Sequence, residues 1–404
     1  MELEYTVITS KRPLDLKTLG APAAGASGVD QELIKNLSAE AQETWAVEHI
    51  KAQPHEMVDL NNDSRTVAVT PAMPMCLIKP EPARQDAQQA KELRNVAWGI
   101  EAVEADRSRF TGERVRVAVL DTGILETHPA FTRVPLLVQN FTTDASANDG
   151  NGHGTHCAGT IAGGEVEGTR IGVTSNLERL IIGKVLSDQG QGSTTAIVQG
   201  IQWASLQGAH IISMSLGIDF TAYVEGLHQR QGVELKAAVS MGLQAYSANV
   251  EMFEKLGDSF NALSFIGQGS MLVAAAGNES RRPTYTIGTS PPAVADSILS
   301  VAAVDQNFAA APFSNTYADV SAPGVDITSA GLDGGLSVLS GTSMAAPHVA
   351  GVAALWAQKL LESESQLNIE RLKSTLYANL SAAGDRAMPD LENTGRGVIK
   401  SPEI

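Results

Sequence analysis

The chain has 404 residues, of which 43% are hydrophobic and 18% are charged, and its formal net charge at pH 7 is −16. This composition is that of an ordinary globular protein with room for one large domain and a smaller one. The negative charge argues against a nucleic acid or an anionic membrane as partner, because both bind basic faces. The two cysteines, Cys76 and Cys157, are too few for a disulfide framework.

The first residues give no sign of export. Residues 1–9 have neither the basic head nor the apolar core of a signal peptide, and no run of about 18 apolar residues exists to span a membrane. We therefore expect a cytoplasmic protein, or a secreted one whose export signal is missing from this sequence.

Residues 1–94 form a separate segment. The stretches Glu4–Thr9 and Arg65–Thr70 alternate like short strands, and Glu32–Ala52 has few helix breakers and predicts a helix. The segment ends in a proline-rich linker, which no helix or central strand is expected to contain. Its prolines are Pro71, Pro74, Pro80 and Pro82. The pattern predicts a small α+β segment followed by a domain boundary.

From residue 95 to 404, apolar strand patterns alternate with helix patterns. This alternation predicts an α/β fold in which a parallel β-sheet is covered by helices on both faces. The expected strands are Val115–Leu120, Leu180–Val185, His210–Met214, Met271–Ala275 and Ile298–Val304. The expected helices begin at His153, Ser193, Ser343 and Gln366.

Three polar residues stand where such a fold builds its sites. Asp121 follows a buried strand, His153 follows a glycine-rich turn at a helix start, and Ser343 lies at the N-terminus of an apolar helical pattern. An isolated serine at a helix start is usually only a cap. A nucleophilic serine needs a base, and the base needs an orienting acid, so the three residues together predict nucleophilic catalysis.

Five motifs resemble those of the subtilisin-like serine proteases. They are Asp121-Thr122-Gly123, His153-Gly154-Thr155-His156, Ser213-Met214-Ser215-Leu216-Gly217, Ala274-Ala275-Ala276-Gly277-Asn278-Glu279 and Gly341-Thr342-Ser343-Met344-Ala345-Ala346-Pro347. They occur in the family's order, and the similarity covers roughly residues 95–400. The resemblance implies a serine endopeptidase that hydrolyses a protein or peptide substrate through an acyl-enzyme.

The resemblance also implies a role for each catalytic residue. Ser343 is the nucleophile, His153 the general base and acid, and Asp121 the residue that orients the imidazole. Asn278 is expected to donate its amide to the oxyanion, together with the backbone N–H of Ser343. His156, three residues after His153, is a rival base to which the family pattern gives a structural role.

Substrate binding is assigned to two of the same motifs. Substrate is expected to add a strand through main-chain hydrogen bonds, which favours broad specificity. The residues expected in this surface are Ser215, Leu216, Gly217 and Gly277. Ile218 stands where many relatives have a second glycine, so the adjoining pocket is expected to be narrower. We expect no metal site and no cofactor.

Two parts of the chain depart from the bare protease pattern. Residues 1–94 have the position of a prodomain that blocks the cleft until it is cut within 71–94, so the chain is expected to be a zymogen. A permanent regulatory domain is the alternative, and a catalytically silent scaffold or a maturation protease for one partner are alternative functions. Residues 218–255 are a helix-compatible insertion, which is either a packed decoration or a lid beside the cleft.

Overall fold

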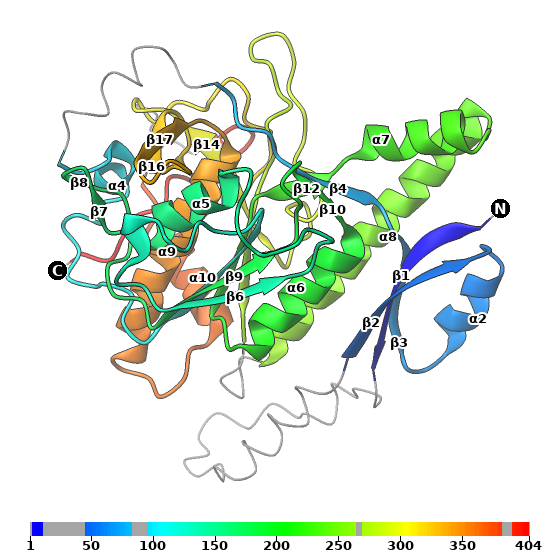
Figure 1. Ribbon diagram of the computed structural model, residues 1–404, viewed down its shortest axis with the longest axis horizontal. Coiled ribbons are helices and arrows are strands. Elements are labelled where there is room, and N and C mark those ends of the chain that lie inside the picture. The colour runs from blue at the N-terminus through cyan, green and yellow to red at the C-terminus, as the bar shows by residue number, and fades with distance from the viewer. Residues whose placement is uncertain (1, 11–44, 83–94, 264–268, 382–389, 404) are drawn as a thin grey trace.

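The computed structural model describes residues 2–10, 45–82, 95–263, 269–381 and 390–403. Its centre is a seven-stranded, all-parallel sheet (Figure 1). The sequence predicts the parallel arrangement and five of these strands, but not the two edge strands. Its strands, in spatial order, are β15 (Val320–Pro323), β14 (Leu299–Val304), β13 (Met271–Ala275), β11 (Ile211–Met214), β5 (Arg116–Asp121), β9 (Arg179–Lys184) and β6 (Leu136–Asn140).

Helices cover both faces of this sheet. Side chains alternate along each strand, so Val117 and Val119 of β5 face one hydrophobic cluster while Ala118 and Leu120 face the other. The first cluster is closed by α5 (His153–Ala162), α9 (Thr342–Leu361) and α10 (Ile369–Ala378). The second is closed by α6 (Thr194–Leu206) and α8 (Leu235–Ala262). The predicted α/β class is therefore confirmed.

The remaining elements of this part are short. They are α4 (Trp98–Ala102), the 3₁₀-helix η2 (Pro129–Phe131) and the hairpins β7 (Glu165–Val166) with β8 (Thr169–Arg170) and β16 (Ile327–Ala330) with β17 (Leu336–Leu339). Within the described residues, no helix is both long and apolar enough to cross a membrane.

The N-terminal segment contains its own antiparallel sheet, in the order β2–β1–β3, with α2 (Glu56–Asn62) beside it. The strands are β1 (Leu3–Ser10), β2 (Trp45–Ala52) and β3 (Thr66–Pro71). The predicted helix over Glu32–Ala52 is wrong for residues 45–52, and residues 32–44 lie outside the described part. These eight residues pair with β1 over its whole length, and this distant pairing overrides a local pattern that merely lacks helix breakers.

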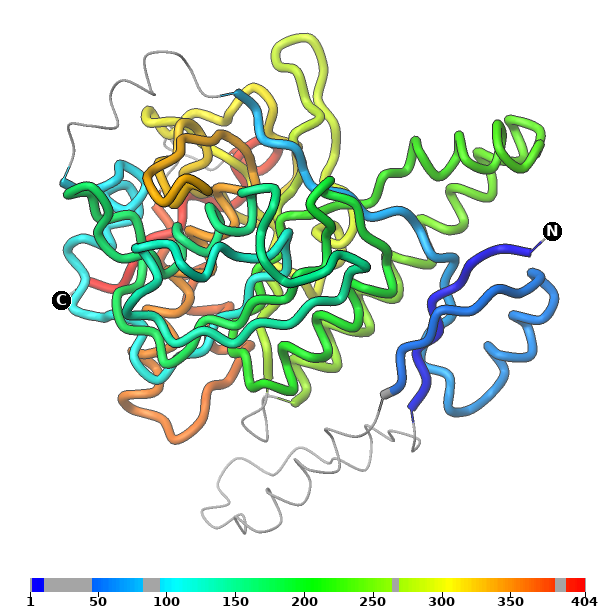
Figure 2. Tube along the Cα trace, in the orientation of Figure 1, coloured from blue at the N-terminus to red at the C-terminus, as the bar shows by residue number. Residues whose placement is uncertain are grey.

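The proline-rich linker enters the protease as a strand. β4 (Pro74–Leu77) lies between β10 (Gln191–Ser193) and β12 (Leu216–Ile218), antiparallel to both. The expectation that no central strand could contain these prolines is therefore wrong for Pro74. Pro74 is the first residue of β4, where a missing N–H is tolerated, and its carbonyl accepts from the backbone N–H of Asp219 at 2.9 Å. Figure 2 shows this blue segment running from the N-terminal sheet across the protease.

The predicted insertion is helical. It contains α7 (Phe220–Glu225), the π-helix η3 (Gly226–Arg230) and α8. The helix α8 has 28 residues and continues to Ala262, beyond the predicted end of the insertion. Phe220 of α7 packs edge-on against Tyr246 of α8, so the two helices form a hairpin. We call residues 219–246 the arm; it projects from the protease beside the N-terminal sheet (Figure 1).

Candidate active site

The carboxylate of Asp121 is placed by the end of β5. It is fully buried, and its Oδ1 accepts a hydrogen bond from the backbone N–H of Thr122 at 2.7 Å. The turn that follows is fixed by the buried ammonium of Lys184, which donates to the carbonyl of Thr122 at 2.6 Å and to Asp188 at 2.7 Å. These contacts therefore fix the position of the Asp121 carboxylate at the carboxyl end of β5.

His153 is the first residue of α5 and faces this acid. The preceding Gly152 has φ = 100°, and this left-handed turn brings the chain into the helix. The Nδ1 atom of His153 lies 2.8 Å from Oδ1 and 3.0 Å from Oδ2 of Asp121, so it carries the proton. Burial is the largest single effect and lowers the pKa of His153, but the charge and hydrogen bond of Asp121, together with the neighbouring Cys157, outweigh burial and hold that pKa well above 6.5.

Asp149 joins the strand and the helix, a role that the sequence analysis missed. Its Oδ1 accepts from the hydroxyl of Thr122 at 2.9 Å, and its Oδ2 accepts from the N–H and the hydroxyl of Thr155 at 2.8 and 2.7 Å. The signal is an acid directly before the Gly-Asn-Gly-His turn, close enough to the helix start to accept from the N–H groups of Gly152 and Thr155. This carboxylate fixes the Asp121 turn relative to the His153 helix.

Ser343 lies in the first turn of α9, fully buried beneath the N-terminal segment. Its carbonyl oxygen accepts from the hydroxyl of Ser215 at 3.2 Å and from the thiol of Cys157 at 3.3 Å. Burial raises the pKa of the Cys157 thiol, so this group is a neutral donor rather than a competing nucleophile. The first turn of α9 is thereby held against both α5 and the residue that joins β11 to β12.

Asn278 is aimed into the site by Thr342. Its Oδ1 accepts from both the N–H and the hydroxyl of Thr342, each at 2.9 Å, which fixes the amide nitrogen toward the cleft. The preceding Gly277 has φ = 115° and donates its N–H to the Thr342 hydroxyl at 3.1 Å. This anchoring role of Thr342 does not follow from its motif alone.

The chain's own residues 74–81 lie across these groups. In the β4–β12 register, Leu216 pairs with Leu77 and Gly217 with Cys76, so β4 occupies the position assigned to a substrate strand. Beyond the strand, the N–H of Glu81 donates to the carbonyl of Ser340 at 2.8 Å. The segment is thus bound on both sides of Ser343.

Two successive carbonyls of this segment meet the catalytic groups. The hydroxyl of Ser343 donates to the carbonyl of Ile78 at 3.2 Å, and the amide nitrogen of Asn278 donates to the carbonyl of Lys79 at 2.9 Å. The Nε2 atom of His153 is buried and makes no hydrogen bond within the described residues. The serine proton is therefore directed at a peptide carbonyl and not at the imidazole.

The structure brings together all the residues expected in catalysis, namely Asp121, His153, Ser343 and Asn278. It places His156 elsewhere: the Nε2 atom of His156 donates to the carbonyl of Ile327 at 3.0 Å, and burial lowers its pKa to about 3. This histidine stays neutral and is bound to a backbone carbonyl of β16, which supports the structural role. Of the expected binding residues, Gly277 uses both of its main-chain groups. Its N–H donates to the hydroxyl of Thr342, and its carbonyl accepts from the backbone N–H of Asn315 at 3.0 Å.

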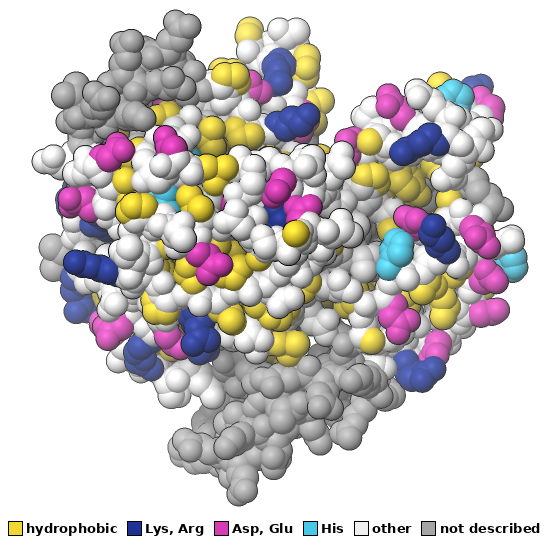
Figure 3. Space-filling view, in the orientation of Figure 1, with side chains coloured by type: hydrophobic (Ala, Val, Ile, Leu, Met, Phe, Trp, Pro, Cys, Tyr) yellow, Lys and Arg dark blue, Asp and Glu magenta, His cyan; other side chains and the backbone are white. Residues whose placement is uncertain are grey.

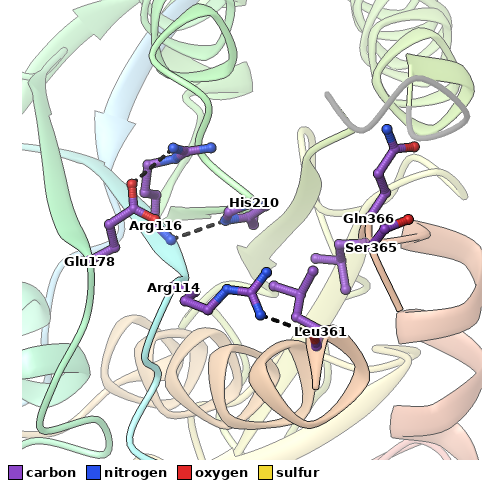
Figure 4. A pocket seen from close by; sticks show the side chains of 8 residues that line it. Arg114, Arg116, Glu178, His210, Leu361, Ser365 and Gln366 are labelled. Carbon is purple, nitrogen blue, oxygen red and sulfur yellow. Dashed lines mark hydrogen bonds and ion pairs between the residues drawn. The ribbon is translucent and has the colours of Figure 1, made fainter. Parts of the chain in front are cut away.

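A pocket of about 250 Å³ lies at the other end of the sheet, where β5, β9 and β11 begin (Figure 4). Arg116 pairs there with Glu178 at 3.0 Å, and its backbone N–H donates to Nδ1 of His210 at 3.0 Å. Arg114 donates to the carbonyl of Leu361 at 3.1 Å. These polar groups satisfy one another, whereas Asp121 lies at the opposite, carboxyl end of β5.

The chain is similar to known proteins over most of its length. The family model described as the subtilase family matches residues 112–394. Subtilisin DY of Bacillus licheniformis is 36% identical over 297 residues, which are 72% of this chain and 93% of that protein. An alkaline protease of Alkalihalobacillus alcalophilus is 36% identical over 280 residues, 68% of this chain and 63% of that protein.

An intracellular serine protease of Paenibacillus polymyxa is 35% identical over 305 residues, which are 73% of this chain and 82% of that protein. The matched region contains Asp121, His153, Asn278 and Ser343. A buried acid–histidine pair beside a serine at a helix N-terminus is the arrangement that acyl transfer requires. The chain therefore belongs to the subtilase family and is a serine endopeptidase.

Proposed function

We propose that Ser343, His153, Asp121 and Asn278 share the chemistry of peptide hydrolysis. The Oγ of Ser343 attacks the substrate carbonyl as its proton passes to Nε2 of His153, and the imidazolium then protonates the leaving amine. Asp121 holds the tautomer that leaves Nε2 free. Water repeats the sequence on the acyl-enzyme and releases the second product. The observation that carries this proposal is the 2.8 Å contact between Nδ1 of His153 and Asp121.

We further propose that residues 1–94 are a cleft-blocking prodomain and that the chain is a zymogen. The support is the strand β4, which pairs with β10 and β12 and fills the substrate position. The segment is also anchored past the serine by the Glu81–Ser340 bond and by an ion pair of 3.1 Å between Glu81 and Arg281.

The same contacts suggest why this segment resists the serine it covers. Attack needs one carbonyl to receive the oxyanion donors while the serine proton goes to the histidine. Here the Ser343 hydroxyl donates to the carbonyl of Ile78, and the Asn278 amide donates to the carbonyl of Lys79. The donor set is divided between adjacent peptide groups, so neither group is positioned for acylation.

Both proposals are tested by comparing full-length wild type with Ile78→Asp, Val58→Asp and Ser343→Ala. Ile78 is buried against the protease, whereas Val58 is 59% exposed on α2 and is the matched control. We expect Ile78→Asp to react faster with a fluorophosphonate and to hydrolyse peptides faster than wild type, with no change in Val58→Asp. Ser343→Ala is expected to be inert.

Intact mass after incubation then tests the zymogen. Loss of the N-terminal segment from wild type but not from Ser343→Ala supports a cleaved prodomain, and equal reactivity of wild type and Ile78→Asp contradicts the cleft block. A silent scaffold is supported only if none of the variants reacts with the fluorophosphonate. Profiling against a peptide library separates broad specificity, which backbone pairing favours, from a maturation protease with one narrow preference.

We propose the cytoplasm as the location of this protein. The name of the Paenibacillus polymyxa relative, an intracellular serine protease, supports this proposal. Fractionation of the source cells tests it, and recovery of the protein in the medium would contradict it.

A further inference from the structure

The N-terminal sheet has two faces, and the protease contacts both. On one face, the hydroxyl of Thr6 lies 2.8 Å from the hydroxyl of Thr195 at the start of α6. Ile8 on the same face is fully buried in the cluster that includes α6 and α8. This face rests on helices that also cover the central sheet.

The opposite face packs against the arm. Leu3, Tyr5 and Val7 alternate with the first set along β1 and form a separate cluster with α2. The arm completes that cluster with three side chains that are at most 8% exposed, namely Val224, Leu227 and Ala238. The small core of the N-terminal sheet is therefore shared with a part of the protease that the sequence identifies as an insertion.

Polar contacts attach α8 to the strand that leaves the sheet. Asn249 is fully buried; its amide nitrogen donates to the carbonyl of Pro71 at 3.0 Å, and its Oδ1 accepts from the hydroxyl of Thr194 at 3.2 Å. The hydroxyl of Thr70 contacts the sulfur of Met252 at 3.7 Å. None of these contacts depends on residues 74–81, so the sheet has an attachment separate from the cleft.

We propose that the arm is a docking element for the N-terminal sheet, residues 2–10 and 45–71, which keeps the sheet bound after the chain is cut between it and the protease. The arm and sheet form one continuous lobe on the right of Figure 3. The insertion then does not act as a lid over the substrate. It sets how long the cut N-terminal segment remains bound to the protease. This proposal rests on the proposed cleft block, whose release it would control.

The test uses the full chain carrying Ser343→Ala, with a flexible linker and a recognition site for a specific protease inserted within residues 83–94. After complete cutting, size-exclusion chromatography and intact mass show whether the N-terminal fragment stays with the protease. We compare the parent with Leu227→Asp, which puts a charge in the shared cluster, and Leu243→Asp. Leu243 lies on α8 but is 57% exposed, so it is the matched control.

We expect the fragment to remain bound in the parent and in Leu243→Asp and to be released from Leu227→Asp. If Leu227→Asp does not fold, Leu227→Ala replaces it. The fragment should then dissociate at least about tenfold faster than from the parent, since deleting a buried leucine side chain typically removes more than the 1.4 kcal/mol that equals tenfold. Release from the parent, or equal retention by the Leu227 variants and the control, overturns the proposal.

The same cut protein with Ser343 intact distinguishes this inference from the cleft block. A fragment that stays bound while Ser343 reacts freely with a fluorophosphonate contradicts the block and leaves the docking role standing. A fragment that leaves the parent at once, in a chain that was unreactive before cutting, contradicts the docking role and leaves the block standing. A different protein bound to the vacated arm in place of the fragment would also overturn the assignment of this occupant.

Discussion

The side-chain amide of Asn278 donates to the carbonyl of Lys79 at 2.9 Å, although the neighbouring carbonyl of Ile78 is the one that Ser343 contacts. The oxyanion donor is therefore in place, but it binds the carbonyl of the peptide group that follows the one contacted by Ser343. Two properties of the site are therefore distinct. One is the direction in which its hydrogen-bond donors point, and the other is the register of the peptide bound in the cleft.

The first prediction concerns the aim of Asn278. In the activated enzyme, we expect Asn278→Ala to lower kcat by about 10²–10³, a figure that comes from subtilisin itself. Thr342→Val removes the hydroxyl that holds Oδ1 but keeps the backbone N–H, so its loss in kcat should be smaller. Steady-state kinetics measure both, and a Thr342→Val loss as large as that of Asn278→Ala would contradict the assignment of the amide as the donor.

The second prediction concerns Asp121. We expect Asp121→Asn to lower kcat by about 10⁴ at neutral pH, as for the equivalent change in a trypsin-type enzyme, because an amide does not enforce the tautomer with a free Nε2. Thermal unfolding serves as the control, since the geometry around the amide can be kept. An Asp121→Asn enzyme with wild-type kcat and an unchanged melting temperature would exclude the acid from catalysis.

The third prediction follows from the pKa of His153, which lies well above 6.5. The base must be neutral, so kcat/KM of the activated enzyme should fall as pH drops through that pKa, by about tenfold per unit once the imidazole is mostly charged. Removing residues 74–81 exposes the ring and lifts the burial that lowers its pKa, so the midpoint should stay above 6.5. A pH profile of kcat/KM measures it, and a midpoint below 6.5 would contradict the raised pKa of His153.

The fourth prediction compares two glycines with positive φ. A Cβ on Gly277 would lie 2.3 Å from Nδ2 of Asn315, whereas a Cβ on Gly168 would meet nothing within 4 Å. Gly168→Ala should lose only the backbone strain, about 1 to 2 kcal/mol of unfolding free energy. Gly277→Ala should lose about 1 to 3 kcal/mol more and should also lower kcat, because the turn that carries Asn278 must shift. Urea unfolding and kcat check both, and equal losses would contradict the clash.

Local sequence was sufficient for the catalytic elements. The apolar run before Asp121 and the glycine-rich turn before His153 each specify their own strand or helix, and a parallel sheet collects the carboxyl ends of its strands at one edge. Helix compatibility also predicted that the insertion is helical, although α8 continues to Ala262. In these cases the information that defines the element lies within a few residues of it.

Local sequence does not predict the strands that form only by pairing with residues far away in the chain. The strand β2 depends on β1, and β4 depends on partners such as Ser193, which pairs with Pro74 across the chain. Thr342 and Asp149 are common polar residues whose roles come from the groups they meet in space. The contact between the arm and Tyr5 likewise follows from the packing of two separate segments, and the local sequence of neither segment predicts it.

The position of β4 has a consequence for the cleaved enzyme that we propose, from which that strand has departed. β10 and β12 both hydrogen-bond to β4 and not to each other, so its departure leaves two open strand edges separated by roughly 10 Å, twice the usual strand spacing. Such a slot admits a single extended backbone and excludes a helix, whose diameter with side chains is about 10–12 Å. Proteins with intact helices should therefore survive exposure to the enzyme, while unfolded or loosely tethered chains of similar composition are cut.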